Sequence, residues 1–261
     1  MNQIVVITGG TSGICLELKK LYEKDNDTVL TISTRKLDDD KHYSLDVADE
    51  TAIKNAIDDI GAKYGKIDVL INGAGFGMSG VTELLNNDDV KKLTEVNYYG
   101  TIYAVQSAIK YMSKGSKIIN ISSAMALFPV PFRAIYGSVK SAVLTFSFAL
   151  RMELEHLGII VTAVCPGDIK TNFTKNRIKN FETNERYGNK ISSATEKSDS
   201  REDKRISAEK CALVTYKKIT KKKIKPFFIV GKKFQFLYFL TRITPKGLLL
   251  KFTNKFYGGT F

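Results

Sequence analysis

A tyrosine and a lysine four residues apart, Tyr136 and Lys140, are the pair best suited to chemistry in this sequence. Their spacing places both side chains on one face of a helix, one turn apart. A free phenol has a pKa of about 10, and an ammonium group beside it favours the phenolate and lowers that pKa. Ser123 follows an apolar run at residues 117–121 that predicts a buried strand. We therefore expect Tyr136 to move a proton while the Ser123 hydroxyl holds a substrate oxygen.

The order of several motifs along the chain favours this chemistry over the alternative, an amphipathic helix with a surface lysine. A glycine-rich turn, an Asn-x-Ala-Gly sequence at 72–75 and a Val-Asn pair at 96–97 all precede Ser123. This ordered set resembles the short-chain dehydrogenase/reductase family over about residues 3–230. The resemblance implies four catalytic residues: Asn97, Ser123, Tyr136 and Lys140. In the family the asparagine distorts its helix and holds a water that relays protons to the lysine.

The glycine-rich turn at residues 8–15 lies between a predicted strand and a predicted helix. Backbone N–H groups in such a turn approach a pyrophosphate, and the helix N-terminus adds its positive end; a merely tight turn is the alternative. The family pattern is TGxxxGxG, and Cys15 stands where the last glycine is expected. We expect the Cys15 side chain to push the helix outward and to weaken cofactor binding somewhat. The turn contributes five expected cofactor contacts: Gly9, Thr11, Ser12, Gly13 and Ile14.

The end of the next predicted strand, residues 28–33, indicates which dinucleotide is bound. An acidic residue there would accept the 2′-hydroxyl of NAD, but Arg35 and Lys36 follow this strand. Arginine offers a planar fork of donors to a phosphate, so we expect NADP(H) in preference to NAD(H). The alternative is a solvated pair neutralised by the carboxylates at residues 38–40.

Further cofactor positions are implied by the resemblance. Asp46 and Val47 match the adenine-contacting position, although an N-cap role for Asp46 or Asp49 is an equal alternative. The edge at residues 72–75 lies against the ribose and nicotinamide side, and Gly73 replaces the usual second asparagine there. The remaining expected contacts come from this edge, from the catalytic pair and from a Pro-Gly segment that closes on the nicotinamide: Asn72, Ala74, Gly75, Tyr136, Lys140, Pro166, Gly167, Ile169 and Thr171.

The pattern of apolar runs predicts an α/β fold, a doubly wound parallel (Rossmann) sheet of about seven strands. With 261 residues and 43% hydrophobic content, one domain is expected. We expect residues 1–231 to form an NADP(H)-binding catalytic domain and residues 232–261 to form a C-terminal basic amphipathic extension. Polar residues at about 172–206 correspond to the substrate lid of the family, and a disordered insertion is the alternative.

The excess of basic over acidic residues that gives the net charge of +13 lies in the C-terminal part of the chain. Residues 1–200 hold 24 Lys and Arg against 24 Asp and Glu, whereas residues 201–261 hold 16 against 3. The three cysteines and two histidines show no metal-ligand spacing, so we expect neither a metal site nor a disulfide framework. No secretion signal precedes the first predicted strand, and these features together predict a cytoplasmic protein.

Apolar residues at 234–257 recur at spacings of three and four, with lysines on other faces, which predicts an amphipathic helical extension. Arg242 and Pro245 interrupt it, and no apolar run approaches the roughly 18 to 20 residues that span a bilayer. Peripheral contact with an anionic membrane, docking across a subunit and docking over the substrate mouth all remain open. The lysines lack a separate base-stacking platform, so no nucleic-acid partner is expected.

The expected activity is an NADP(H)-dependent interconversion of a secondary alcohol and a ketone on a bulky apolar substrate. The apolar loop around Leu127, Phe128 and Phe132 is either core or pocket wall. With the tail, whose counterparts accompany steroid- and retinol-type members, it favours a hydroxysteroid dehydrogenase. The alternatives are a 3-oxoacyl carrier-protein reductase or another lipid ketone reductase and, outside enzymes, a cofactor-binding regulator with a basic tail. A homodimer or homotetramer is expected.

Overall fold

Seven parallel strands form the central sheet of the computed structural model, which describes residues 2–171, 173, 177–199 and 205–257. Their order across the sheet is β11-β7-β6-β4-β1-β2-β3, which confirms the predicted doubly wound fold. The direction of winding reverses between β1 and β4, and ligands of such sheets bind at the carboxyl ends of the strands at this point. The strands are β1 (Ile4–Thr8), β2 (Thr28–Ser33), β3 (His42–Ser44), β4 (Val69–Asn72), β6 (Lys117–Ile121), β7 (Ile160–Pro166) and β11 (Phe227–Val230).

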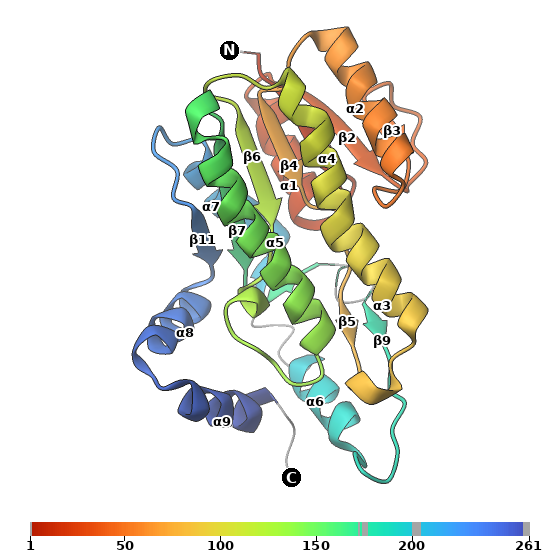
Figure 1. Cartoon of the computed structure of the whole chain (residues 1–261), viewed down its shortest axis with the longest axis vertical. Helices are drawn as coiled ribbons and strands as arrows, with labels where there is room; N and C mark the ends of the chain where they lie inside the picture. Colours follow the sequence, from red (N-terminus) through yellow and green to blue (C-terminus); the bar gives the residue numbers. More distant parts are fainter. Residues whose placement is uncertain (1, 172, 174–176, 200–204, 258–261) are drawn as a thin grey trace.

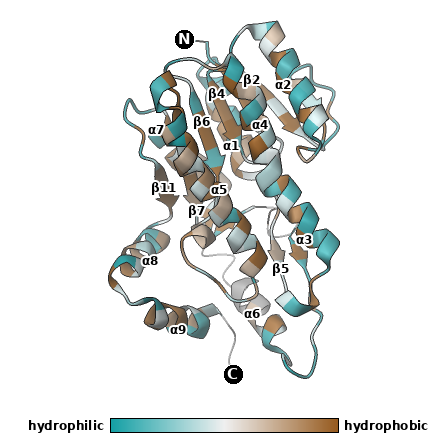
Figure 2. Ribbon diagram, in the orientation of Figure 1, coloured by the Kyte–Doolittle hydropathy of each residue, from teal (hydrophilic) through white to brown (hydrophobic). Residues whose placement is uncertain are grey.

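Helices cover both faces of this sheet (Figure 1). On β1, Val6 packs into one apolar cluster while Val5 and Ile7 pack into the other, because successive strand residues point to opposite faces. Figure 2 shows the strands coloured mainly as hydrophobic, as expected of a sheet that is covered on both faces. One face is covered by α1 (Gly13–Lys24) and α7 (Ala208–Ile219), and the other by α2 (Glu50–Tyr64), α4 (Gly100–Ala108) and α5 (Ala134–Glu153).

The helical stretch at residues 87–111 is divided. It consists of α3 (Asn87–Thr94), a π-helical turn at Glu95–Tyr99, α4 and a 3-10 turn at Ile109–Tyr111. The irregularity expected around Asn97 is therefore present, and Asn97 lies at its centre. Three further 3-10 turns are Thr82–Leu84, Ala124–Ala126 and Glu155–Leu157.

The segment predicted as a lid contains regular structure where it is described. Two short parallel pairings tie it to the body, β8 (Ile169–Lys170) with β10 (Ile206–Ser207) and β9 (Ile178–Lys179) with β5 (Met78–Ser79). Between them lies α6 (Lys190–Asp199). Residues 172, 174–176 and 200–204 of the predicted lid lie outside the described residues.

Two helices, α8 (Lys232–Ile243) and α9 (Lys246–Tyr257), confirm the predicted helical extension, of which residues 258–261 lie outside the described part. Phe234 of α8 anchors it, because its ring stacks on Phe128 with 6.0 Å between the centroids. The extension and α6 lie beyond the carboxyl ends of the strands (Figure 1), and α9 contacts α6. Among the described helices, none combines the length and the apolar character needed to cross a bilayer.

Candidate active site

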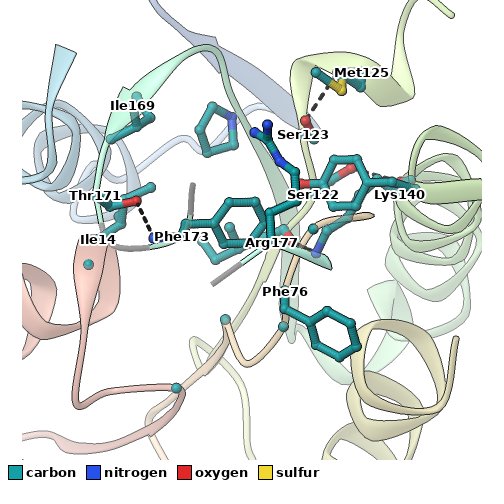
Figure 3. Close-up of a pocket in the computed structure, with 18 of the residues that line it drawn as sticks. Ile14, Phe76, Ser122, Ser123, Met125, Lys140, Ile169, Thr171, Phe173 and Arg177 are labelled. Atoms are coloured by element: carbon teal, nitrogen blue, oxygen red, sulfur yellow. Dashed lines mark hydrogen bonds between the residues drawn. The ribbon is translucent and has the colours of Figure 1, made fainter. Parts of the chain in front are cut away.

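A cavity of about 240 Å³ lies at the carboxyl edge of the sheet. It is bordered by the glycine-rich turn after β1, the loop after β4, the end of β6, the start of α5 and the segment after β7. Figure 3 shows Ile14, Ile169 and Thr171 on one side and Ser123 and Lys140 on the other. The sequence-predicted residues that line it are Gly9, Ser12, Gly13, Ile14, Ala74, Gly75, Ser123, Tyr136, Lys140, Pro166, Gly167, Ile169 and Thr171.

Lys140 is a buried cation with 5% exposure. Its Nζ donates to the Ile121 carbonyl at 3.1 Å, and its own backbone carbonyl accepts from Ser122 Oγ at 2.8 Å. These two bonds hold α5 against the end of β6, and so they fix where the ammonium group lies. Burial lowers the pKa of Lys140 to about 8, because removing the ammonium from water disfavours its charged form.

Tyr136 is also buried, and burial is the largest influence on its phenol, raising its pKa. The Ser123 hydroxyl and the guanidinium groups of Arg177 and Arg133 act in the opposite direction and lower this pKa. The sequence predicts Lys140 as the group that lowers this pKa. In the structure the Lys140 ammonium donates to the Ile121 carbonyl, and the arginines supply the opposing charge.

Asn97 lies behind the cavity and holds part of its wall. Its Nδ2 donates to the Phe76 carbonyl at 3.2 Å and to the Leu93 carbonyl at 3.0 Å. Its buried Oδ1 has no hydrogen-bond partner within the described part of the chain. A Cβ at Gly75 would overlap this Oδ1, so a glycine is needed there. Asn97 therefore fixes the backbone of the loop that lines the cavity.

The backbone around the glycine-rich turn forms a cradle that fits a dinucleotide. Gly9 has a φ of +72°, and a Cβ there would lie 2.8 Å from the Ala74 nitrogen. Thr8 Oγ1 accepts from the Gly73 and Ala74 nitrogens at 3.1 and 3.2 Å, which ties the β4 loop to the end of β1. Two backbone segments thus meet without intervening side chains in front of the N-terminus of α1, an arrangement suited to a pyrophosphate.

The cysteine at position 15 is accommodated by a second departure from the family pattern. A Cβ at Gly73 would overlap Cys15 Sγ, so the thiol occupies the space of the side chain that position 73 lacks. Cys15 is buried, and burial raises the pKa of its thiol to about 12. The expected displacement of the helix is therefore offset by Gly73, which leaves room for the thiol.

Arg35 extends from the end of β2 toward the glycine-rich turn. Its Nη1 donates to the Thr11 carbonyl at 3.3 Å, while its own carbonyl accepts from Ser44 Oγ at 2.9 Å. Of the three carboxylates that follow it, Asp39 forms an ion pair with Lys19 at 3.5 Å. The guanidinium group therefore lies next to the turn that suits a dinucleotide.

Several predicted cofactor residues do not line the cavity: Thr11, Arg35, Lys36, Asp46, Val47 and Asn72. Asn72 is buried, and its Nδ2 donates to Asn120 Oδ1 at 2.9 Å, so it joins β4 to β6. Asp46 is exposed and accepts from the Ala48 nitrogen at 3.0 Å in a turn. The helix cap is instead Asp49, which accepts from the Ala52 nitrogen at 2.9 Å.

The apolar wall of the cavity differs from the one that the sequence suggests. Phe128 is core, stacked on Phe234, and neither it nor Phe132 lines the cavity. The apolar side chains that do line the cavity were not predicted from the sequence: Phe76, Met125 and Phe173. Three arginines that also line it were missed as well: Arg133, Arg177 and Arg205. The Phe173 ring lies 6.0 Å from that of Tyr136. The pairing of β9 with β5 brings the segment of Phe173 and Arg177 over the site, and no local pattern predicts that pairing.

With this geometry in place, comparison with known proteins identifies the family. A family model described as short chain dehydrogenase matches residues 3–182. The chain belongs to the short-chain dehydrogenase/reductase family.

Three curated relatives align with much of this chain. The 3-ketodihydrosphingosine reductase of Bacteroides thetaiotaomicron is 32% identical over 67% of each chain. The probable dehydrogenase/reductase VdlC of Helicobacter pylori is 30% identical over 93% of each. The 3-oxoacyl-[acyl-carrier-protein] reductase FabG of Thermotoga maritima is 30% identical over 67% of this chain and 77% of its own.

Solved structures of the family share the fold over most of the chain. A short-chain dehydrogenase from Streptomyces avermitilis has a TM-score of 0.82, with 23% identity and full coverage of both chains. ElxO with NADP bound has a TM-score of 0.71 and 26% identity, over 88% of this chain and 96% of its own. The 3-ketoacyl-(acyl-carrier-protein) reductase of Brucella melitensis, solved with NADH, has a TM-score of 0.71 and 19% identity, over 87% and 96%. The fold thus accommodates either nicotinamide dinucleotide.

Proposed function

We propose that this chain is an NADP(H)-dependent oxidoreductase that interconverts a secondary alcohol and a ketone on a bulky apolar lipid. The observation that carries this proposal is the buried Tyr136, which lies with Ser123 and Lys140 in the cavity that the glycine-rich turn also lines. When bound, the nicotinamide would supply or accept a hydride at the carbinol carbon.

The chain's own residues supply the proton and the orientation. In the reductive direction the Tyr136 hydroxyl gives its proton to the carbonyl oxygen, and the Ser123 hydroxyl donates a hydrogen bond to the same oxygen. The guanidinium groups of Arg133 and Arg177 stabilise the phenolate that remains, while the Lys140 ammonium keeps its bond to the Ile121 carbonyl. Asn97 acts by positioning Gly75 and Phe76, and a water on its Oδ1 is the proposed route of proton return.

NADP(H) is the proposed cofactor because Arg35 presents a guanidinium beside the glycine-rich turn, where a 2′-phosphate accepts a fork of donors. Replacing this side chain by Arg35→Ala is expected to weaken NADPH binding about tenfold or more and to leave NADH binding unchanged. Titration of each reduced dinucleotide by fluorescence energy transfer from protein tyrosines measures this. The matched control is Lys41→Ala, an exposed lysine farther along the same loop.

The proposed substrate is a long-chain lipid ketone, of which 3-ketodihydrosphingosine is the first candidate because a relative that is 32% identical carries that name. The walls of Phe76, Met125 and Phe173 support an apolar substrate. A hydroxysteroid, the substrate favoured by the sequence, belongs to the same apolar class and is the second candidate. A carrier-protein thioester is the third, and the relative FabG supports it.

The test is a spectrophotometric assay of nicotinamide oxidation and reduction with purified full-length protein. The panel contains 3-ketodihydrosphingosine, hydroxysteroids with their ketones, and an acetoacetyl thioester. We expect the largest kcat/KM with the long-chain ketone and NADPH. Turnover of the thioester alone would move the assignment to carrier-protein substrates. The variant Tyr136→Phe should lower kcat about a thousandfold while binding NADPH normally, and full turnover by it would refute the mechanism.

The remaining alternative is a cofactor-binding regulator without turnover. It requires that the protein bind NADPH and yet turn over no member of the panel.

The proposed assembly is a homodimer or homotetramer, as is common in this family, and sedimentation velocity measures it. The cytoplasm is the proposed compartment.

A further inference from the structure

The two helices of the extension keep an apolar surface on the outside of the molecule. Six large side chains, each between 48% and 64% exposed, form what we call the outer ridge: Phe236, Phe239, Ile243, Leu248, Phe252 and Phe256. Spacings of three and four place the first three on one face of α8 and the last three on one face of α9. Exposed apolar helix faces of this kind are typical of surfaces that bind a partner.

The inner face of the same helices is already in use. On α8, Phe234 stacks on Phe128, and the Tyr238 ring lies 5.6 Å from that of Phe227. On α9, Thr253 is buried, and it lines a cavity of about 530 Å³ together with Asn254 and the loop at residues 129–131. None of the described residues that line the active-site cavity comes from residues 232–257. The extension therefore packs beside the site without covering it, and the outer ridge is left exposed.

Charge indicates the chemistry of the partner. Residues 232–257 contain six Lys and Arg and no Asp or Glu, and the absence of acidic residues continues from residue 210 to the end of the chain. A symmetric contact between two copies through this face would bring like charges together. Cations around an apolar helix face suit a surface that is itself anionic and has an apolar interior, which describes a membrane of acidic phospholipids.

We propose that the outer ridge docks this protein on the surface of a membrane rich in anionic phospholipids. The ridge enters the boundary between headgroups and acyl chains, and the exposed cations Lys233, Arg242 and Lys246 bind the headgroup phosphates. The extension lies beyond the carboxyl ends of the strands (Figure 1), and the active-site cavity is at this same edge of the sheet. Docking therefore turns the end of the molecule that carries the cavity toward the bilayer. The inference depends on the surface alone and does not require the proposed reaction.

Vesicle flotation of the full-length protein tests the docking. Vesicles of phosphatidylcholine alone are compared with vesicles that also contain phosphatidylglycerol, at low and high salt and without substrate. We expect at least about tenfold more protein on the anionic vesicles, and less as salt rises. Equal binding to both kinds of vesicle, or to neither, overturns the proposal.

Two sets of variants separate the apolar and the charged contributions. The triple variant Phe236→Ser/Phe239→Ser/Ile243→Ser is expected to reduce vesicle binding about tenfold or more. Its control is Met152→Ser/Leu157→Ser, two side chains that are 70% and 44% exposed elsewhere, which should bind normally. The pair Arg242→Gln/Lys246→Gln is expected to lose about 25-fold, against no loss in Lys24→Gln/Lys63→Gln. Undiminished binding by either test variant overturns the proposal.

Other occupants of the ridge give different results. If the triple variant changes the sedimentation coefficient of the protein while no vesicle binding is seen, the ridge is a contact between copies of the chain. Salt-dependent retention on duplex DNA without vesicle binding assigns the charge to nucleic acid. Either outcome overturns the docking. The Tyr136→Phe variant should bind vesicles as the parent does, so failure of the proposed reaction and failure of docking are observed separately.

Discussion

The sheet domain and the extension use the same kinds of side chain in opposite ways. Thirteen large apolar residues are exposed among those described, and seven of them lie in the 26 residues from 232 to 257. The far longer sheet domain exposes only the other six and balances its charges over residues 1–200. Apolar residues in the sheet domain therefore stabilise the fold, whereas those of the outer ridge contribute to it little. The difference shows that aromatic content alone does not identify a core, because the partner of each ring decides its role.

The tightest complementarity in the sheet domain is between Cys15 and Gly73, and we expect the largest effect there. The substitution Gly73→Asn adds a Cβ that overlaps Cys15 Sγ, and the rest of the asparagine side chain has to fit beyond it. Overpacking and burial of an amide together should lower the free energy of unfolding by about 4 kcal/mol. Urea denaturation measures the loss.

The double variant Cys15→Gly/Gly73→Asn is the control, because it restores the arrangement that is usual in the family. It should recover at least half of the stability lost by Gly73→Asn, which corresponds to a coupling free energy of about 2 kcal/mol. If the double variant is as unstable as Gly73→Asn, the two positions are independent and the exchange of volume is not the explanation.

The next effect concerns a ring that belongs to both regions. Phe128 of the sheet domain is 5% exposed and stacks on Phe234 of α8. The substitution Phe128→Ala removes that contact and leaves a cavity, so it should cost about 3 kcal/mol in urea denaturation. Protease cleavage within α8 should also become faster, because the anchor of the extension is lost. Unchanged cleavage would mean that the extension is held by α9 instead.

Local sequence patterns predicted the parts of the site that are built from consecutive residues. The glycine-rich turn, Ser123 and the Tyr136 and Lys140 pair follow strands or occupy one helix face, so neighbours in sequence determine where they lie. The positions of Phe173 and Phe128 depend on contacts with residues far along the chain, at β5 and at Phe234. Asn72 has the residue type expected of a cofactor contact, yet its partner Asn120 is 48 residues away. Such pairings are set by tertiary structure, and periodicity does not reveal them.

Lys140 differs from the apolar core residues of the sheet domain, because burying its charged side chain lowers the free energy of unfolding. Its pKa of about 8 lies below the usual value of 10.5, so the folded state disfavours the proton that the unfolded chain holds. The full destabilisation by the buried charge is present below about pH 8, and it decreases as the pH rises from about 8 to about 10.5. We expect Lys140→Met to raise the free energy of unfolding by about 2 kcal/mol at pH 7, after allowance for the lost bond to Ile121.

This gain should diminish steadily above pH 8 and reverse before pH 10.5, above which the parent lysine is neutral in both states and only the lost bond to Ile121 separates the two proteins. Denaturation curves of the parent and the variant at several pH values, without added cofactor, measure the difference, and other titrating groups cancel between them. A gain that is independent of pH would show that the amine is solvated. Turnover should fall in the same variant, so stability and activity change in opposite directions.

The smallest effect is expected on the outer ridge, and it completes the comparison. Phe239 is a phenylalanine like Phe128, but it is 57% exposed against 5%. Because the Phe239 ring is exposed to water in the folded state, Phe239→Ser should change the free energy of unfolding by less than about 0.5 kcal/mol. Measured beside Phe128→Ala under the same conditions, it tests whether the ridge contributes to the fold. A loss of about 2 kcal/mol or more would place Phe239 in a packed contact, and the ridge would then be part of the structure rather than a surface kept for a membrane.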